Sequence, residues 1–263
     1  MSLFRRNYDR PGPGVSKDEP RKKGVARFFE VLFRDFFDLV KLNVLFCLCA
    51  LPTVAAFLYG FLGGFSIIIY ILSLIVAFPV GGAAVALSFC VTKMLRDEPG
   101  YMWHEFKRKF KENVKQAALP GIICTALIQA QVFMWISQML DTTGTGFIWL
   151  IAMFALFLIF TMVAPYIFVI FAYVDLKAMQ VIQNSILLSL AKVPRSIAGA
   201  LFGSALWIVF ILYLPVSLLF LPVIALFAVS VSWLLCLMWV WPPVNKQFSI
   251  EETINARRDK END

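Results

Sequence analysis

Residues 147–173 read FIWLIAMFALFLIFTMVAPYIFVIFAY, a run of 27 residues without a charged side chain. About 20 apolar residues suffice for a helix to cross a bilayer, so this run predicts a transmembrane span. Charged residues are also absent from 42–92, 116–140 and 196–245. A charge at the centre of a membrane helix costs about 2.5–3.5 kcal/mol on insertion scales. The four uncharged runs therefore favour an all-α protein that crosses the membrane several times.

The composition agrees with this interpretation. Of the 263 residues, 60% are hydrophobic, whereas soluble domains are typically about 45–50% apolar. The net charge is +7. The basic residues flank the apolar runs instead of forming a separate basic domain, which favours charge at the membrane edge over nucleic-acid binding. We therefore expect no nucleic-acid partner.

The charge distribution predicts the number of spans and their orientation. All 24 Lys and Arg residues can be placed on one side of a membrane. The run 196–245 is too long for one span and suits two, with a turn near Pro215–Pro222. Because short cytoplasmic loops carry the excess of Lys and Arg, we expect both termini in the cytoplasm. The six predicted spans are about 39–59, 65–92, 117–140, 147–173, 197–214 and 219–241.

The spans belong to one helical membrane domain, expected over 28–245. A flexible basic cytoplasmic tail over 1–27 precedes it, and a second cytoplasmic tail over 246–263 follows it. Residues 28–38 repeat apolar side chains at helical spacing and predict an amphipathic lead-in helix.

Prolines and small residues should shape the spans. Pro79 removes a backbone hydrogen bond and should kink the second span, while Pro242-Pro243 should end the last one. Small side chains let helices approach closely, and their ordinary meaning is packing. They occur at Gly81, Gly82, Ala83, Ala84 and Ala86, and again at Gly199 and Gly203.

Residues 101–117, YMWHEFKRKFKENVKQA, predict a cytoplasmic amphipathic helix between the second and third spans. Near an anionic bilayer each basic residue contributes about 1 kcal/mol. Two interpretations are open: a helix that docks a cytoplasmic partner, or one that only anchors on lipid headgroups. A weaker version of the pattern at 175–195 suggests an internal duplication. The candidate interfacial or docking residues are Trp103, Phe106, Lys107, Arg108, Lys109, Phe110, Lys111 and Lys115.

A few amide side chains fall inside the predicted spans. Amides in hydrocarbon need partners, so these side chains should face the bundle interior. There they either bond between helices or line a path for a neutral ligand. Asp, Glu, Lys and Arg are absent from the span interiors, which argues against a proton-driven transporter. The candidate intramembrane polar residues are Asn43, Gln129, Gln131 and Gln138.

Catalytic signatures are missing from the sequence. His104 is next to Glu105, but adjacent residues on a helix diverge and a third catalytic group is missing. The five cysteines lie in predicted spans without metal-ligand spacing. A phosphate-binding loop is also absent. We therefore expect no enzyme activity, cofactor or metal site.

Several segments resemble the bacterial YesL-like family, a domain of unknown function. The likeness covers roughly 8–210. It is carried by Tyr8–Val15, Lys17-Asp18 with Pro20, Leu39–Asn43 through Leu51-Pro52, Thr92–Glu98, Gly100-Tyr101, Phe106-Lys107 and Phe110–Asn113. Members are often associated with genes for sugar uptake by ATP-driven importers, so the resemblance implies an accessory role in carbohydrate uptake.

Three functions therefore remain as hypotheses. The first is a non-enzymatic accessory protein that docks on a sugar-importer permease through 101–117. The second is a transporter or channel for a small neutral solute. The third is a lipid-binding or membrane-shaping protein. An anionic inner leaflet is expected as a partner under each hypothesis, and the sequence leaves the oligomeric state open.

Overall fold

The computed structural model describes residues 22, 24–63, 67–140, 146–212 and 221–262, with side chains described outside 135–150, 210–225 and 257–262. Every regular element in these ranges is a helix. The helices are α1 (Val25–Arg34), α2 (Phe36–Leu62), α3 (Ile67–Val76), α4 (Phe78–Leu95), α5 (Met102–Asn113), α6 (Ala118–Leu140), α7 (Gly146–Tyr173), α8 (Ala178–Ala191), α9 (Val193–Leu212), α11 (Leu221–Phe248) and α12 (Ile250–Asn262).

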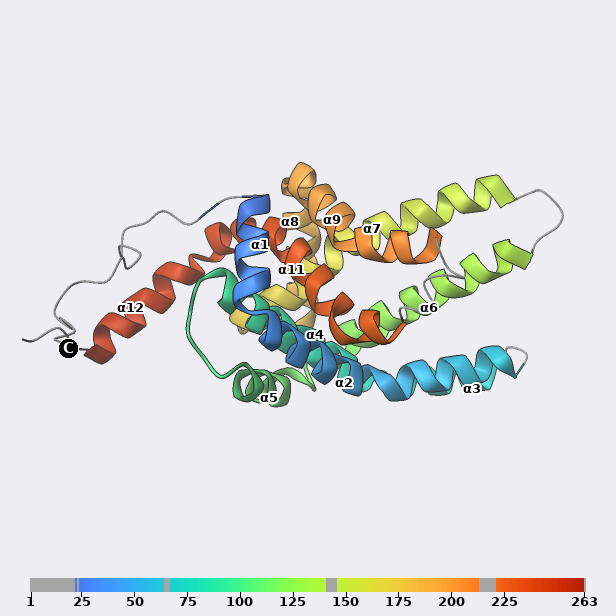
Figure 1. Cartoon of the computed structure of the whole chain (residues 1–263), viewed down its shortest axis with the longest axis horizontal. Helices are drawn as coiled ribbons and strands as arrows, with labels where there is room; N and C mark the ends of the chain where they lie inside the picture. The colour runs from blue at the N-terminus through green and yellow to red at the C-terminus, as the bar shows by residue number, and fades with distance from the viewer. Residues whose placement is uncertain (1–21, 23, 64–66, 141–145, 213–220, 263) are drawn as a thin grey trace, which may run out of the picture.

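Pairs of helices extend towards one end of an elongated molecule. Figure 1 shows α2 with α3 and α6 with α7 reaching the right, while α1, α5 and α12 lie towards the left. Among the described residues, α2, α4, α7 and α11 are each long and apolar enough to cross a membrane. The count rises from 4 to 6 if two bent pairs, α5 with α6 and α8 with α9, each count as one span. These lengths and compositions are those of a multi-pass membrane protein.

The predicted second span is divided into two helices. Helix α3 ends at Val76 and α4 begins at Phe78, with Pro79 in the first turn of α4, where its missing N–H costs nothing. Of the apolar segment of α4, 72% is buried within the protein, against 11% for α2. Helix α4 is thus the centre of the bundle, and α2 lies at its edge.

Glycine allows α4 to lie directly on the junction between α5 and α6. A Cβ on Gly81 would overlap the Ala117 carbonyl oxygen, and one on Gly121 would overlap the Gly81 backbone. A Cβ on Gly82 would lie 2.8 Å from the Val114 Cα. The small residues predicted to allow close approach therefore pack helices of the same chain.

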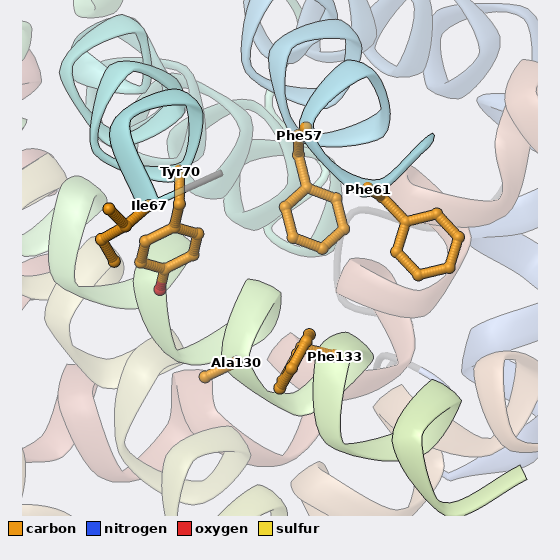
Figure 2. A pocket seen from close by; sticks show the side chains of 7 residues that line it. Phe57, Phe61, Ile67, Tyr70, Ala130 and Phe133 are labelled. Atoms are coloured by element: carbon orange, nitrogen blue, oxygen red, sulfur yellow. The ribbon is translucent and has the colours of Figure 1, made fainter. Parts of the chain in front are cut away.

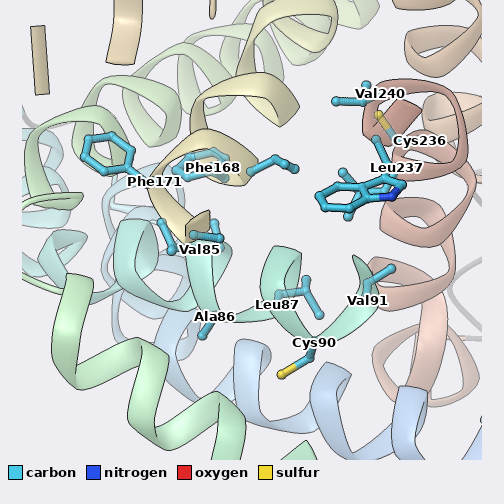
Figure 3. Packing of buried hydrophobic residues seen from close by; sticks show 14 of the residues in the cluster. Val85, Ala86, Leu87, Cys90, Val91, Phe168, Phe171, Cys236, Leu237 and Val240 are labelled. Carbon is cyan, nitrogen blue, oxygen red and sulfur yellow. The ribbon is translucent and has the colours of Figure 1, made fainter. Parts of the chain in front are cut away.

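The other side of α4 packs on α7 and α11. Figure 3 shows Val85 and Leu87 of α4 facing the same interior as Phe168 of α7 and Leu237 of α11. The Trp233 Nε1–H donates a 2.9 Å hydrogen bond to the Ser88 Oγ, which satisfies the indole within this apolar core. The core therefore joins helices from both halves of the chain.

Two predictions about helix boundaries are wrong. Helix α11 continues through Pro242-Pro243 to Phe248. The residues around this pair, Val240 and Val244, are fully buried, and tertiary packing outweighs the local preference of proline to end a helix. The lead-in segment 28–38 is likewise not one helix, because α1 and α2 meet at Asp35.

Candidate docking surface at the basic end

The apolar face of helix α5 is buried inside the protein. Met102, Phe106 and Asn113 are buried, and Phe106 is only 3% exposed. The half-buried Phe110 ring stacks on Phe106 with centroids 6.4 Å apart. Trp103, which follows Met102 at the start of the helix, is 59% exposed instead. The predicted amphipathic helix is present, but α5 packs mainly on α4, with smaller contacts to α2 and α7.

A central carboxylate ties α5 to the end of α4. The Lys93 Nζ lies 2.9 Å from the Glu105 Oε1, and the Arg108 guanidinium donates to the other carboxylate oxygen. Burial alone would raise the pKa of Glu105, but the hydrogen bond and charge of Lys93, aided by Arg108, outweigh it and hold that pKa below its ordinary value. Glu105 is therefore ionised at neutral pH and keeps both basic partners.

The remaining basic residues of the segment separate into two groups. Lys109 is half-buried, with its Nζ 5.0 Å from the Phe89 ring centre and 2.9 Å from the Glu112 Oε2. Lys107, Lys111 and Lys115 are exposed, and among the described residues none of the three has an ion-pair partner. These three lysines, together with Trp103, form the free outer surface of the α5 segment.

Helix α1 is fixed against the last turn of α4 by two arginines. The Arg27 Nη2 donates to the Leu95 carbonyl at 2.8 Å, and the Arg34 Nη2 donates to the Met94 carbonyl at 2.9 Å. Both guanidinium groups also bind the Asp97 carboxylate. Asp97 has a φ of 60° directly after α4, the left-handed position that commonly follows a helix. The sequence pattern did not indicate that Arg27 and Arg34 would meet Asp97.

A second buried cation joins three helices. Arg96 packs its guanidinium carbon 5.1 Å from the Tyr173 ring centre and 5.3 Å from that of Trp241. It pairs with Glu98 at 3.1 Å and donates to the Tyr173 Oη at 3.0 Å. The Thr92 hydroxyl completes the set, 2.6 Å from the same Oη. Because the aromatic partners come from α7 and α11, only the folded chain brings this set together.

The predicted intramembrane amides bond to neighbouring helices. The Asn43 Oδ1 accepts the Ser230 N–H at 3.0 Å, which joins α2 to α11. The Gln129 Oε1 accepts the Ser73 hydroxyl at 3.1 Å. The Gln131 Nε2 donates to the Met153 carbonyl at 3.2 Å. The Gln138 side chain lies outside the described residues. The three described amides act as links between helices.

A hollow of about 260 Å³ lies between α2, α3 and α6. Figure 2 shows Phe57, Phe61 and Phe133 around it. The Tyr70 hydroxyl at its edge donates to the Ala126 carbonyl at 3.3 Å. With an apolar lining, the hollow offers no polar path for a neutral solute.

The described part of the chain offers no cluster of metal-ligating side chains. Across those residues, no three His, Cys, Asp or Glu side chains are grouped to hold a metal ion. His104 is exposed on α5.

A family model described as "Protein of unknown function, DUF624" matches residues 39–133. The matched region runs from α2 into α6 and includes α5 and its outer lysines. No curated protein and no solved structure matches the chain. The matching family has no assigned activity, and its description does not mention the YesL-like resemblance.

Proposed function

We propose that the chain is a non-enzymatic accessory protein of the bacterial cell membrane that docks on an ATP-driven carbohydrate importer through the exposed surface of α5. The main support is the burial of Phe106. A helix that only anchors on lipid needs its apolar face in the bilayer, whereas α5 places that face inside the protein. Its basic outer surface is then free for a partner. The importer as partner rests on the YesL-like resemblance.

The same proposal places α5 and both termini in the cytoplasm. The helix ends next to 64–66 and 141–145 lie at one end of the molecule, and the sequence of these two segments contains no Lys or Arg. The basic segment α5 lies towards the other end. Under the positive-inside rule, the basic end faces the cytosol.

Solute transport is less well supported than docking. A path for a neutral solute needs several polar groups that are free to bind it, yet Asn43 and Gln129 bond to another helix through their side-chain oxygens. Gln131 bonds to another helix through its Nε2, and of the three amide oxygens only its buried Oε1 has no hydrogen-bond partner among the described residues. These bonds favour a static bundle that carries a docking surface.

Copurification tests the docking proposal. Tagged full-length protein is extracted in mild detergent, and the importer permease is quantified by mass spectrometry. The variant Trp103→Ala/Lys107→Glu changes two exposed residues at the amino-terminal half of α5. The control, Lys177→Glu/Met179→Ala, makes matching changes at the exposed start of α8.

We expect the α5 variant to recover at least tenfold less permease, and the control to recover as much as the original chain. Equal recovery by the two variants, or no permease with the original chain, would contradict docking through α5. Circular dichroism of each purified variant confirms that the helices are retained.

A further inference from the structure

The chain turns sharply where α5 gives way to α6. The two helix axes differ by 101°. The inner side of this α5–α6 elbow is filled, because Val114, Ala117 and Gly121 lie against the glycines of α4. Any ligand must therefore approach the outer side.

The outer side of the elbow changes from basic to apolar over a short distance. Lys111 and Lys115 are exposed on the α5 side. Leu119 and Ile123, one and two turns further along the chain, are 59% and 45% exposed at the start of α6. A phospholipid presents the same order of chemistry, with an anionic phosphate followed by an acyl chain.

The acidic residues near these lysines are already paired. Glu112 lies 2.9 Å from Lys109, and Glu105 is shared by Lys93 and Arg108. Two cationic side chains therefore remain next to an apolar helix surface without an anion from the described part of the chain.

We propose that the outer side of the α5–α6 elbow binds an anionic phospholipid, with its phosphate on Lys111 and Lys115 and an acyl chain along Leu119 and Ile123. The composition of α6 supports a lipid as the occupant, because α6 begins next to these lysines and continues as a long uncharged apolar helix. This site takes Lys111 and Lys115 from the outer surface of the α5 segment, lies at the opposite end of α5 from Trp103 and does not depend on a protein partner.

Native mass spectrometry of the full-length protein tests the site. The protein is reconstituted in vesicles with equal amounts of phosphatidylglycerol and phosphatidylcholine, and the lipids retained after extraction are counted. The test variant is Lys111→Gln/Lys115→Gln. The control is Lys177→Gln/Lys192→Gln, which removes two exposed lysines that flank α8.

A basic residue near an anionic surface contributes about 1 kcal/mol, or about a fivefold change in binding. We therefore expect the original chain and the control to retain phosphatidylglycerol preferentially, and the test variant to weaken that retention by about thirtyfold. Leu119→Asn should reduce the retention of both lipids. Glycerol phosphate in excess should not compete, because it lacks the acyl chain.

Equal retention of the two lipids by the original chain would overturn the proposal, as would unchanged retention by the test variant. Competition by glycerol phosphate would indicate a phosphate site without a lipid. If the test variant does not fold, the original chain decides the matter: its unfolding temperature should rise with phosphatidylglycerol and not with phosphatidylcholine. Permease copurification is a separate measurement, so the failure of either proposal leaves the other standing.

Discussion

Helices α5 and α8 occupy corresponding places in two halves of the chain. Each follows a long apolar helix, and each is bent by 101° from the helix after it. Their surfaces nevertheless differ. Helix α5 buries Phe106 and exposes lysines, whereas α8 buries Val181 and Ser185 and exposes Leu187 and Leu190, at 65% and 62%.

The exposed faces of α5 and α8 therefore suit different surroundings, although the two helices are arranged alike. The range of α8, 178–191, contains no charged residue, so its exposed face suits lipid or another apolar surface. Helix α5 suits water, headgroups or an acidic protein surface. The repeated elbow agrees with an internal duplication, but the two surface helices have different chemistry. The proposed docking therefore rests on the side chains of α5 and not on the elbow itself.

Removal of the buried ring of α5 should have the largest effect. Phe106→Ala should lower the free energy of unfolding by about 3–5 kcal/mol, the usual cost of replacing a buried Phe by Ala. The matched change on the exposed face of α8 is Ile186→Ala, which should stay within about 0.5 kcal/mol. Denaturant unfolding in a fixed detergent, followed by tryptophan fluorescence, measures both.

Equal costs for these two variants would show that the contrast between the helices is false. A large cost for Ile186→Ala alone would mean that α8 is packed and α5 is free. The docking proposal would then lose its main support.

The packing of α4 on the α5–α6 elbow and the packing of α9 on α11 should also respond differently to an added methyl group. Gly81→Ala would push against the Ala117 carbonyl oxygen, a backbone atom, so the loss should reach at least the upper end of the usual range of about 1–3 kcal/mol for overpacking. At Gly199 a new Cβ would lie 3.3 Å from the Cys236 carbonyl oxygen, and Gly199→Ala should cost about 1 kcal/mol or less. Unfolding temperatures in the same detergent give the order, and a reversed order would contradict the tighter α5–α6 junction.

The sequence predicts the long helices well because a charged side chain in hydrocarbon is costly. The long helices can therefore be recognised in the sequence as long runs without charge. The predicted span 147–173 and α7, Gly146–Tyr173, differ by one residue. The prolines were harder to interpret. Pro79 lies near a helix start as local chemistry suggests, whereas Pro242 lies inside α11 because burial of its neighbours outweighs local preference.

The environment of each apolar face could not be predicted in the same way. Hydropathy identifies α2 and α4 as similar segments, yet α4 is central and α2 is peripheral. Helical periodicity likewise gives α5 an apolar face without saying whether lipid or protein covers it. The Arg27–Asp97 pair was missed because its two residues are 70 positions apart in the chain and meet only after folding.

The smallest expected effect is the response of the two helices to pH. The pKa of Glu105 is lowered in the folded protein, so its stabilising contact with Lys93 is complete above the ordinary glutamate pKa of about 4.3 and is lost as the pH falls below it. The protection of α5 against hydrogen exchange, taken relative to the intrinsic exchange rate at each pH, should therefore fall between about pH 5 and pH 3, while that of α8, without ionisable side chains, should stay constant. In Glu105→Gln the response of α5 should disappear. If α5 keeps the same response in that variant, another group controls it, and the carboxylate does not hold α5 on the bundle.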